Sequence, residues 1–180
     1  MTKTARLYGS SLYDLAAEEG MVDELMEQTQ QVRQIFREQP EYLKLLQEPS
    51  IPFRERAGMI DDAFGQGGNR YLVNFIKLLC ERGYLGEYAG CCDEYTRRYY
   101  ADHNLTEAVI TSAVALDDTQ KEQLKARLEK MSGKTVLLRE KIDPALLLAG
   151  IRVQMDGKEL DGTVKGRMKE LSRRLSEITV

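Results

Sequence analysis

The chain has little of what most catalytic and metal-binding sites require. Its 180 residues include no tryptophan, only three cysteines and a single histidine, His103. Transition-metal sites are built from several cysteine and histidine side chains held together, so a lone histidine argues against one. Cys80, Cys91 and Cys92 form no C-x-x-C pair and no even disulfide framework. We expect buried thiols in a reducing compartment, with a strained vicinal disulfide between Cys91 and Cys92 as the alternative.

Long hydrophobic runs and a strong charge of one sign are also missing. No stretch of about 18 apolar residues is present, which excludes a membrane-spanning helix. The first twenty residues contain charged side chains such as Arg6, Asp14 and Glu18, so we expect no secretory signal. The net charge of −3 provides no strong field for nucleic acid or an anionic membrane. We therefore expect a soluble intracellular protein that reaches membranes only through a partner.

Three short motifs imitate ligand sites without the context that those sites need. The Gly-Lys-Thr tripeptide at 133–135 resembles the end of a phosphate-binding loop, but Leu128 stands where that loop has a glycine. The glycine cluster at 65–68 follows a predicted helix rather than a strand. The acidic residues between 156 and 161 match no EF-hand spacing, and Asp-Gly pairs are typical of turns. We therefore expect no nucleotide, cofactor or metal, and no nucleophile elbow supports a Ser-His-Asp site.

What the sequence does contain is helical periodicity over its first hundred residues. Apolar residues recur at helical spacing in six segments separated by glycine or proline. The fifth segment is apolar around most of its circumference, so it is expected at the centre of a six-helix bundle. The polar residues 101–104 are predicted to end this domain, which spans 1–104. The predicted helices cover about 8–16, 22–36, 42–46, 53–64, 71–79 and 85–100.

From residue 105 to 180 the pattern predicts a small α/β domain. Asp117 and Asp118 are typical of a helix N-cap, and Gly133 of a helix end. The Asp156-Gly157 pair predicts a type I′ hairpin turn. The fold class is therefore α+β, with a helical bundle followed by a short mixed sheet and a β-hairpin. The predicted strands are 108–115, 135–142, 151–155 and a return strand through Leu160, and the predicted helices are 117–131 and 163–178.

Four motifs occur in an order typical of one family. Residues 4–16, TARLYGSSLYDLA, are similar to an opening helix, and residues 78–85, LLCERGYL, to a segment that often ends in Gly-Arg-Leu. Residues 133–144, GKTVLLREKIDP, and 149–167, AGIRVQMDGKELDGTVKGR, complete the series. Together they resemble the delta subunit of F-type ATP synthases, whose mitochondrial counterpart is the oligomycin-sensitivity-conferring protein. Tyr84 departs from the family pattern, in which arginine is common at this position.

The resemblance implies a coupling subunit that performs no chemistry and needs no cofactor. The family joins the catalytic head of the rotary ATP synthase to the peripheral stalk and resists rotor torque during proton- or sodium-driven ATP synthesis. The resemblance implies a peripheral location at the cytoplasmic face of the plasma membrane, as part of the complex. The helical domain is implied to bind the N-terminal segment of an α subunit, and the C-terminal domain to bind the C-terminal helices of the b subunits.

The resemblance also implies binding residues. The α-subunit segment would lie in a groove between the first and fifth helices. Matching motif to motif places this groove at Tyr8, Ser11, Leu15, Tyr71, Asn74 and Leu78. The b subunits would contact apolar positions near the sheet edge and the last helix, namely Leu148, Ile151, Met168 and Leu171. From the residues alone, the apolar members of both sets are explained equally well as core packing.

Two other function classes stay open from the sequence. The last predicted helix carries a basic stripe, formed by Lys165, Arg167, Lys169, Arg173 and Arg174. Such a stripe is usually a solvated face, but it could contact nucleic acid or an acidic partner helix. A nucleic-acid-binding or regulatory module is therefore the alternative, and a small hydrolase is a third reading. Copurification with ATP synthase subunits would separate the first reading from both.

Overall fold

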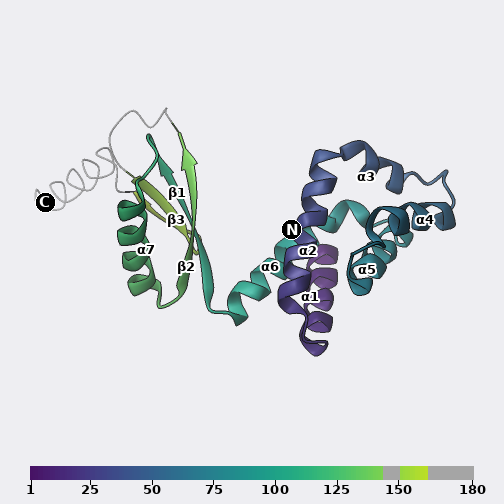
Figure 1. Ribbon diagram of the computed structural model, residues 1–180, viewed down its shortest axis with the longest axis horizontal. Helices are drawn as coiled ribbons and strands as arrows, with labels where there is room; N and C mark the ends of the chain where they lie inside the picture. Colours follow the sequence, from purple (N-terminus) through teal and green to yellow (C-terminus); the bar gives the residue numbers. More distant parts are fainter. Residues whose placement is uncertain (144–150, 162–180) are drawn as a thin grey trace, which may run out of the picture. The chain divides into compact units, whose positions relative to one another are not determined.

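The computed structural model describes residues 1–143 and 151–161 and divides the chain into two compact units, Met1–Tyr100 and Ala101–Val180 (Figure 1). The first unit is helical, and the second contains a sheet with a helix packed on it. The predicted α+β class is confirmed, with seven α-helices and a mixed four-stranded sheet among these residues. Within the same two ranges, no helix is both long and apolar enough to cross a membrane.

Local chemistry sets the ends of the helices in the first unit. Side-chain oxygens of Thr2 and Asn69 cap the N-termini of α1 and α5, and Pro40 begins α3. Gly20 and Gly83 follow α1 and α5 with φ angles of +69° and +72°, in the left-handed region that closes a helix. The elements are α1 (Lys3–Glu18), α2 (Val22–Glu38), α3 (Pro40–Gln47), α4 (Phe53–Phe64), α5 (Arg70–Glu81), the 3-10 turn η1 (Leu85–Glu87) and α6 (Tyr88–Asp102).

One apolar core holds these helices together, and every one of them contributes to it. Helix α5 buries half of its 12 residues on one face and leaves Asn74 and Leu78 exposed, so it is amphipathic rather than buried around most of its circumference. Aromatic rings join α2 and α1 to α6: Phe36 and Tyr88 meet edge to face at 5.2 Å, and Tyr13 and Tyr95 at 5.1 Å. The buried residues of α5 are Leu72, Val73, Phe75, Ile76, Leu79 and Cys80.

Helices α1 and α6 approach closely because glycine and alanine line their contact. A Cβ atom on Gly9 would lie 2.5 Å from the carbonyl oxygen of Cys91 and 2.8 Å from the Cβ of Glu94. On α6, a Cβ on Gly90 would lie 2.8 Å from the Cβ of Ala5. Carbon atoms do not pack at such distances in a close-packed interior. Both positions therefore require glycine at the observed spacing of the two helices.

The second unit is built on a sheet with strand order β2-β1-β3-β4. The central strand β1 (Leu105–Ser112) pairs in parallel with β2 (Thr135–Ile142) and antiparallel with β3 (Ile151–Met155), which pairs with β4 (Lys158–Asp161). Helix α7 (Asp118–Ser132) connects the two parallel strands. Its Leu128 joins a small core formed with residues of the sheet, namely Ala108, Ile110, Val136 and Val153.

Capping and turn residues act in this unit as predicted. The Asp117 carboxylate accepts a hydrogen bond from the backbone N–H of Gln120, and the side-chain oxygen of Gln120 accepts one from the backbone N–H of Asp117. The two bonds form a capping box. Gly133 ends α7 in the left-handed conformation. Asp156 and Gly157 have φ angles of +50° and +73°, as a type I′ turn requires.

The first predicted strand was misplaced. The strand spans Leu105–Ser112 rather than 108–115, because residues 105–107 already pair with residues 135–137 of β2. Helix α6 runs to Asp102, through half of the polar tetrapeptide that was predicted to end the helical domain. It begins at Tyr88, because residues 85–87 form the separate turn η1. The helix predicted at 163–178 lies outside the described residues.

The close contact of α1 and α6 predicts a large difference between two glycine-to-alanine substitutions. Gly9→Ala should lower the free energy of unfolding by about 1–3 kcal/mol, because backbone atoms on α6 would have to move. Gly58→Ala in α4 is the matched control, since no heavy atom lies within 4 Å of its added Cβ. The control should stabilise the helix by about 0.5–1 kcal/mol. Equal effects of both variants in urea denaturation would contradict the close approach.

Candidate protein-binding site

Helices α1 and α5 run past each other in opposite directions. At one end, the ring of Tyr8 on α1 lies 5.8 Å from the ring of Tyr84, which follows α5. At the other end, Glu19 after α1 interacts electrostatically with Arg70, the first residue of α5. Arg70 also donates a hydrogen bond of 2.9 Å to the hydroxyl of Tyr71, and this bond is the main reason that the pKa of Arg70 is raised. These contacts place the two ends of α1 near opposite ends of α5.

The six predicted groove residues lie on the less buried faces of these helices, although Tyr8 also packs against the core. On each helix the three residues follow the spacing i, i+3, i+7, which keeps them on one face. The opposite faces are buried in the core through residues such as Leu12 and Ile76. Leu78 is 39% exposed, a large value for a leucine in an otherwise apolar helix. Ser11, Asn74 and Leu78 are exposed, and Tyr8, Leu15 and Tyr71 are half-buried.

Two further apolar side chains at this surface escaped the sequence analysis. Leu7 is 66% exposed and precedes Ser11 by one helical turn, and the hydroxyl of Ser11 donates a 3.0 Å hydrogen bond to its carbonyl oxygen. Tyr84 is 42% exposed and contacts Tyr8. The sequence could have indicated Leu7, because a residue four positions before Ser11 lies on the same side of a helix. Tyr84 carried no such signal, because only the fold brings it to α1.

A buried carboxylate fixes α1 against α6 beneath this surface. Glu94 is 1% exposed and accepts two hydrogen bonds from Arg97, at 2.6 and 2.9 Å, and one from the hydroxyl of Ser10 on α1 at 3.3 Å. The hydrogen bonds from Arg97 lower the pKa of Glu94 below its ordinary value of 4.5, against the opposing effect of burial. Nearby, Arg98 pairs with Asp14 of α1 at 2.6 Å. Polar contacts thus hold the same crossing that the glycines allow.

Of the four predicted b-subunit contacts, Ile151 lies within the described residues. Ile151, the first residue of β3, is half-buried and packs against the core of the second unit. This packing supports the core interpretation of Ile151. The three other predicted contacts, Leu148, Met168 and Leu171, lie outside the described residues, as do the basic residues of the last predicted helix.

The described residues offer no reactive centre among the groups that the sequence singled out. Cys80, Cys91 and Cys92 are buried free thiols, so the alternative of a vicinal disulfide is wrong. Burial raises the pKa of Cys91 and of Cys92 to about 12, which keeps both protonated at neutral pH. Within residues 1–143 and 151–161, no group of three or more histidine, cysteine, aspartate or glutamate side chains is placed to hold a metal ion.

Comparison with known proteins identifies the family of this chain. The family model of the ATP synthase delta (OSCP) subunit matches residues 4–175. The chain belongs to this family. It is similar to ATP synthase subunit delta of Limosilactobacillus reuteri, with 30% identity over 93% of each chain. It is 26% identical to the subunit delta of Clostridium kluyveri, over 93% of this chain and 92% of that protein.

The fold is shared with a solved ATP synthase component. A chain in the structure of the Toxoplasma gondii mitochondrial ATP synthase hexamer matches with a TM-score of 0.75 and 13% identity, over 97% of this chain and 98% of the other. The ATP synthase delta subunit is a non-catalytic stator subunit of a membrane-associated complex.

The buried carboxylate predicts a pH-dependent stability. Because the folded-state pKa of Glu94 is lowered, its contribution is complete above the unfolded-state pKa and is lost as the pH falls through the folded-state value. Glu94→Gln should therefore cost about 1–2 kcal/mol of unfolding free energy near neutral pH. The difference from the parent should shrink below about pH 4.5.

Asp93→Asn provides the control on the same helix. Asp93 forms a 2.8 Å ion pair with Arg33, in which the side chain of Asp93 is 54% exposed and that of Arg33 is 37% exposed. Such a pair contributes less than about 1 kcal/mol. Urea denaturation of all three proteins between neutral and acidic pH makes the comparison. A Glu94→Gln deficit that stays constant through the acidic range would refute the assignment of the lowered pKa.

Proposed function

We propose that residues 1–104 form a six-helix receiver for the N-terminal segment of an ATP synthase α subunit, held at the faces of α1 and α5. The observation that carries this proposal is the exposure of apolar side chains on adjacent, antiparallel helices. Leu7, Leu78 and Tyr84 are among the most exposed large apolar residues of this unit. An amphipathic helix laid between two such helices would cover them, which is a common mode of peptide recognition.

The groove has features that suit a helical ligand. Ser11 is small, so it lets a partner backbone come near α1. Asn74 interrupts the apolar pattern of α5 and is exposed, so its amide is available to a polar group of the ligand. Tyr8 and Tyr71 place aromatic rings near opposite ends of the two faces, and tyrosine is enriched among residues that dominate binding energy. A stator must remain attached under torque, and nanomolar affinity corresponds to about −12 kcal/mol.

The second part of the proposal assigns residues 105–180 to the C-terminal helices of the b subunits. The two compact units with separate cores support such a division of labour. With both contacts made, the subunit links the catalytic head to the peripheral stalk at the cytoplasmic face of the plasma membrane. The membrane contact is then indirect, through the complex.

Charge and bulk introduced at the groove should weaken the α-subunit contact. Leu78→Glu and Ser11→Asp are each expected to reduce the affinity for a synthetic peptide of the α-subunit N-terminal segment by about 1–3 kcal/mol. Leu45→Glu is the matched control, because Leu45 on α3 is 41% exposed and lies outside the proposed groove. Calorimetry measures the affinities, and circular dichroism must show intact helices. Parent-like binding by both groove variants would place the site elsewhere.

Removal of the second unit should separate the two contacts. A chain ending at Asn104 keeps the whole apolar core of the helical unit, so it is expected to fold. It should bind the α-subunit peptide with parental affinity and lose binding to a soluble b-subunit fragment. Pull-down of both partners with the full chain provides the reference. Loss of both contacts while the helices remain folded would argue against the assigned division.

A further inference from the structure

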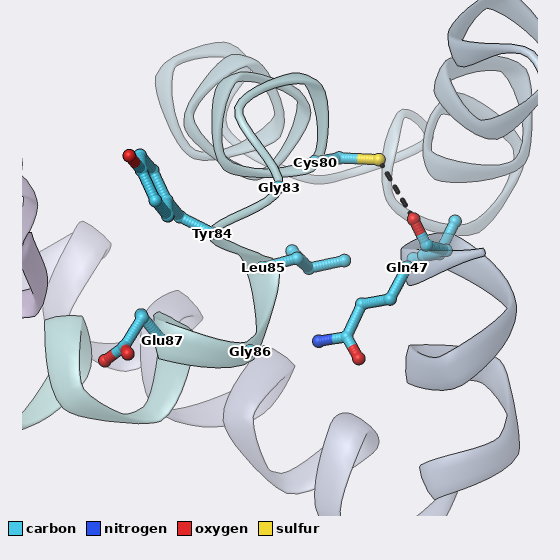
Figure 2. Close-up of a pocket in the computed structure, with 8 residues that line it drawn as sticks. Gln47, Cys80, Gly83, Tyr84, Leu85, Gly86 and Glu87 are labelled. Carbon is cyan, nitrogen blue, oxygen red and sulfur yellow. Dashed lines mark hydrogen bonds between the residues drawn. The ribbon is translucent and has the colours of Figure 1, made fainter. Parts of the chain in front are cut away.

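A hollow of about 450 Å³ lies beside the segment that joins α5 to α6 (Figure 2). Residues 83–86 of this segment line the hollow. Tyr84 and Glu87 project on one side of this segment, and Leu85 and Gln47 lie on the other (Figure 2). Tyr84 links the hollow to the proposed groove, because this residue lines the hollow and its ring contacts that of Tyr8.

The walls of the hollow are fixed by the way α5 ends. Gly83, at a φ angle of +72°, closes the helix, and the N–H of Tyr84 donates a 2.8 Å hydrogen bond to the carbonyl oxygen of Leu79. This bond sets the direction of the Tyr84 side chain. Glu87 is held by a 2.7 Å hydrogen bond that the hydroxyl of Thr2 donates to its carboxylate. Thr2 also caps α1, so the acid stands next to the beginning of that helix.

Glu87 is the feature of the hollow that points to a ligand. Within residues 1–143 and 151–161 its carboxylate accepts the hydrogen bond from Thr2 and forms no ion pair. Its negative charge contributes to the raised pKa of Cys91, after the larger effect of burial. A half-buried carboxylate beside an exposed aromatic ring is a favourable place for a cation, through charge-assisted hydrogen bonds and the face of the ring.

The thiol of Cys80, which borders the hollow, is not a candidate reactive group. Cys80 is 1% exposed, and its Sγ donates a 3.3 Å hydrogen bond to the carbonyl oxygen of Leu46. Burial raises its pKa, although the guanidinium of Arg56 opposes this effect. A buried, protonated thiol is a poor nucleophile. The charged side chain among the residues that line the hollow is therefore Glu87, whereas the exposed amide of Gln47 is neutral.

We propose that this hollow takes a basic side chain, lysine or arginine, from the partner segment that lies between α1 and α5. The proposal rests on the proposed function, because the groove delivers the side chain to the hollow. The basic residue belongs near the end of the partner helix that passes Tyr84. An acidic side chain at that position would meet the Glu87 carboxylate and be disfavoured, so the hollow sets which partner segments fit.

The test uses a substitution that removes the charge and keeps the hydrogen bond. Glu87→Gln leaves an amide oxygen to accept from Thr2, so α1 should stay capped. The synthetic α-subunit peptide should bind this variant about 3- to 10-fold more weakly at low ionic strength. The difference should decrease as salt is added. Glu27→Gln on α2 is the matched control, because Glu27 also accepts one hydrogen bond from a neutral side chain, that of Gln31.

Peptide variants then identify the partner residue. Each lysine or arginine of the α-subunit peptide is replaced in turn by glutamine and titrated against the parent and Glu87→Gln. One replacement should weaken binding to the parent and have little further effect on Glu87→Gln, as coupled residues do in a double-mutant cycle. If the parent binds and no replacement couples to Glu87, this inference is overturned while the groove stands. If Leu78→Glu binds like the parent, or the parent does not bind, the proposed function itself fails.

Discussion

The close approach of α1 to α6 is the contact on which the candidate site depends. It exists because Gly9 and Gly90 have no side chains where the two helices meet, so that no Cβ atom collides with the opposite helix. Glycine inside a helix costs about 0.5–1 kcal/mol relative to alanine, so its use at two such positions has to be offset by the contact that it permits. That contact seats α1 on the core through Leu12 and Ala16 and leaves its other face outward.

The ends of the helices matter as much as their crossings. Both α1 and α5 close with a left-handed glycine followed by a backbone hydrogen bond to the helix, at Gly20–Met21 and at Gly83–Tyr84. At α5 this closure turns an aromatic residue toward α1 and opens the hollow beside Glu87. The local rule that ends a helix therefore also defines one end of the candidate groove. A side chain placed by backbone geometry is held more firmly than one on a free loop.

Sequence reasoning succeeded where the signal was local. The strand 135–142, the cap at Asp117 and the Asp156-Gly157 turn all follow from short-range chemistry, and each is present as predicted. The first strand was misplaced by three residues, because its start is decided by pairing with β2 rather than by the residues of 105–107 themselves. The six groove residues came from the family resemblance, and their spacing of i, i+3, i+7 keeps the three on each helix on one face. Sequence reasoning could not supply Tyr84 or Glu87, because their place beside α1 is a tertiary contact.

The division into two units with separate cores suits a stator subunit, which must resist torque. An attachment between the head and the stalk is a chain of contacts in series, and such a chain fails at its weakest member. Separate cores allow one unit to open locally without loosening the other, which protects each contact from fluctuations of its neighbour. In the helical unit, backbone closures, glycine contacts and the buried Glu94 all restrain α1 against its neighbours. A partner helix held there would meet a surface already ordered, so little of its binding energy would be spent on ordering the receiver.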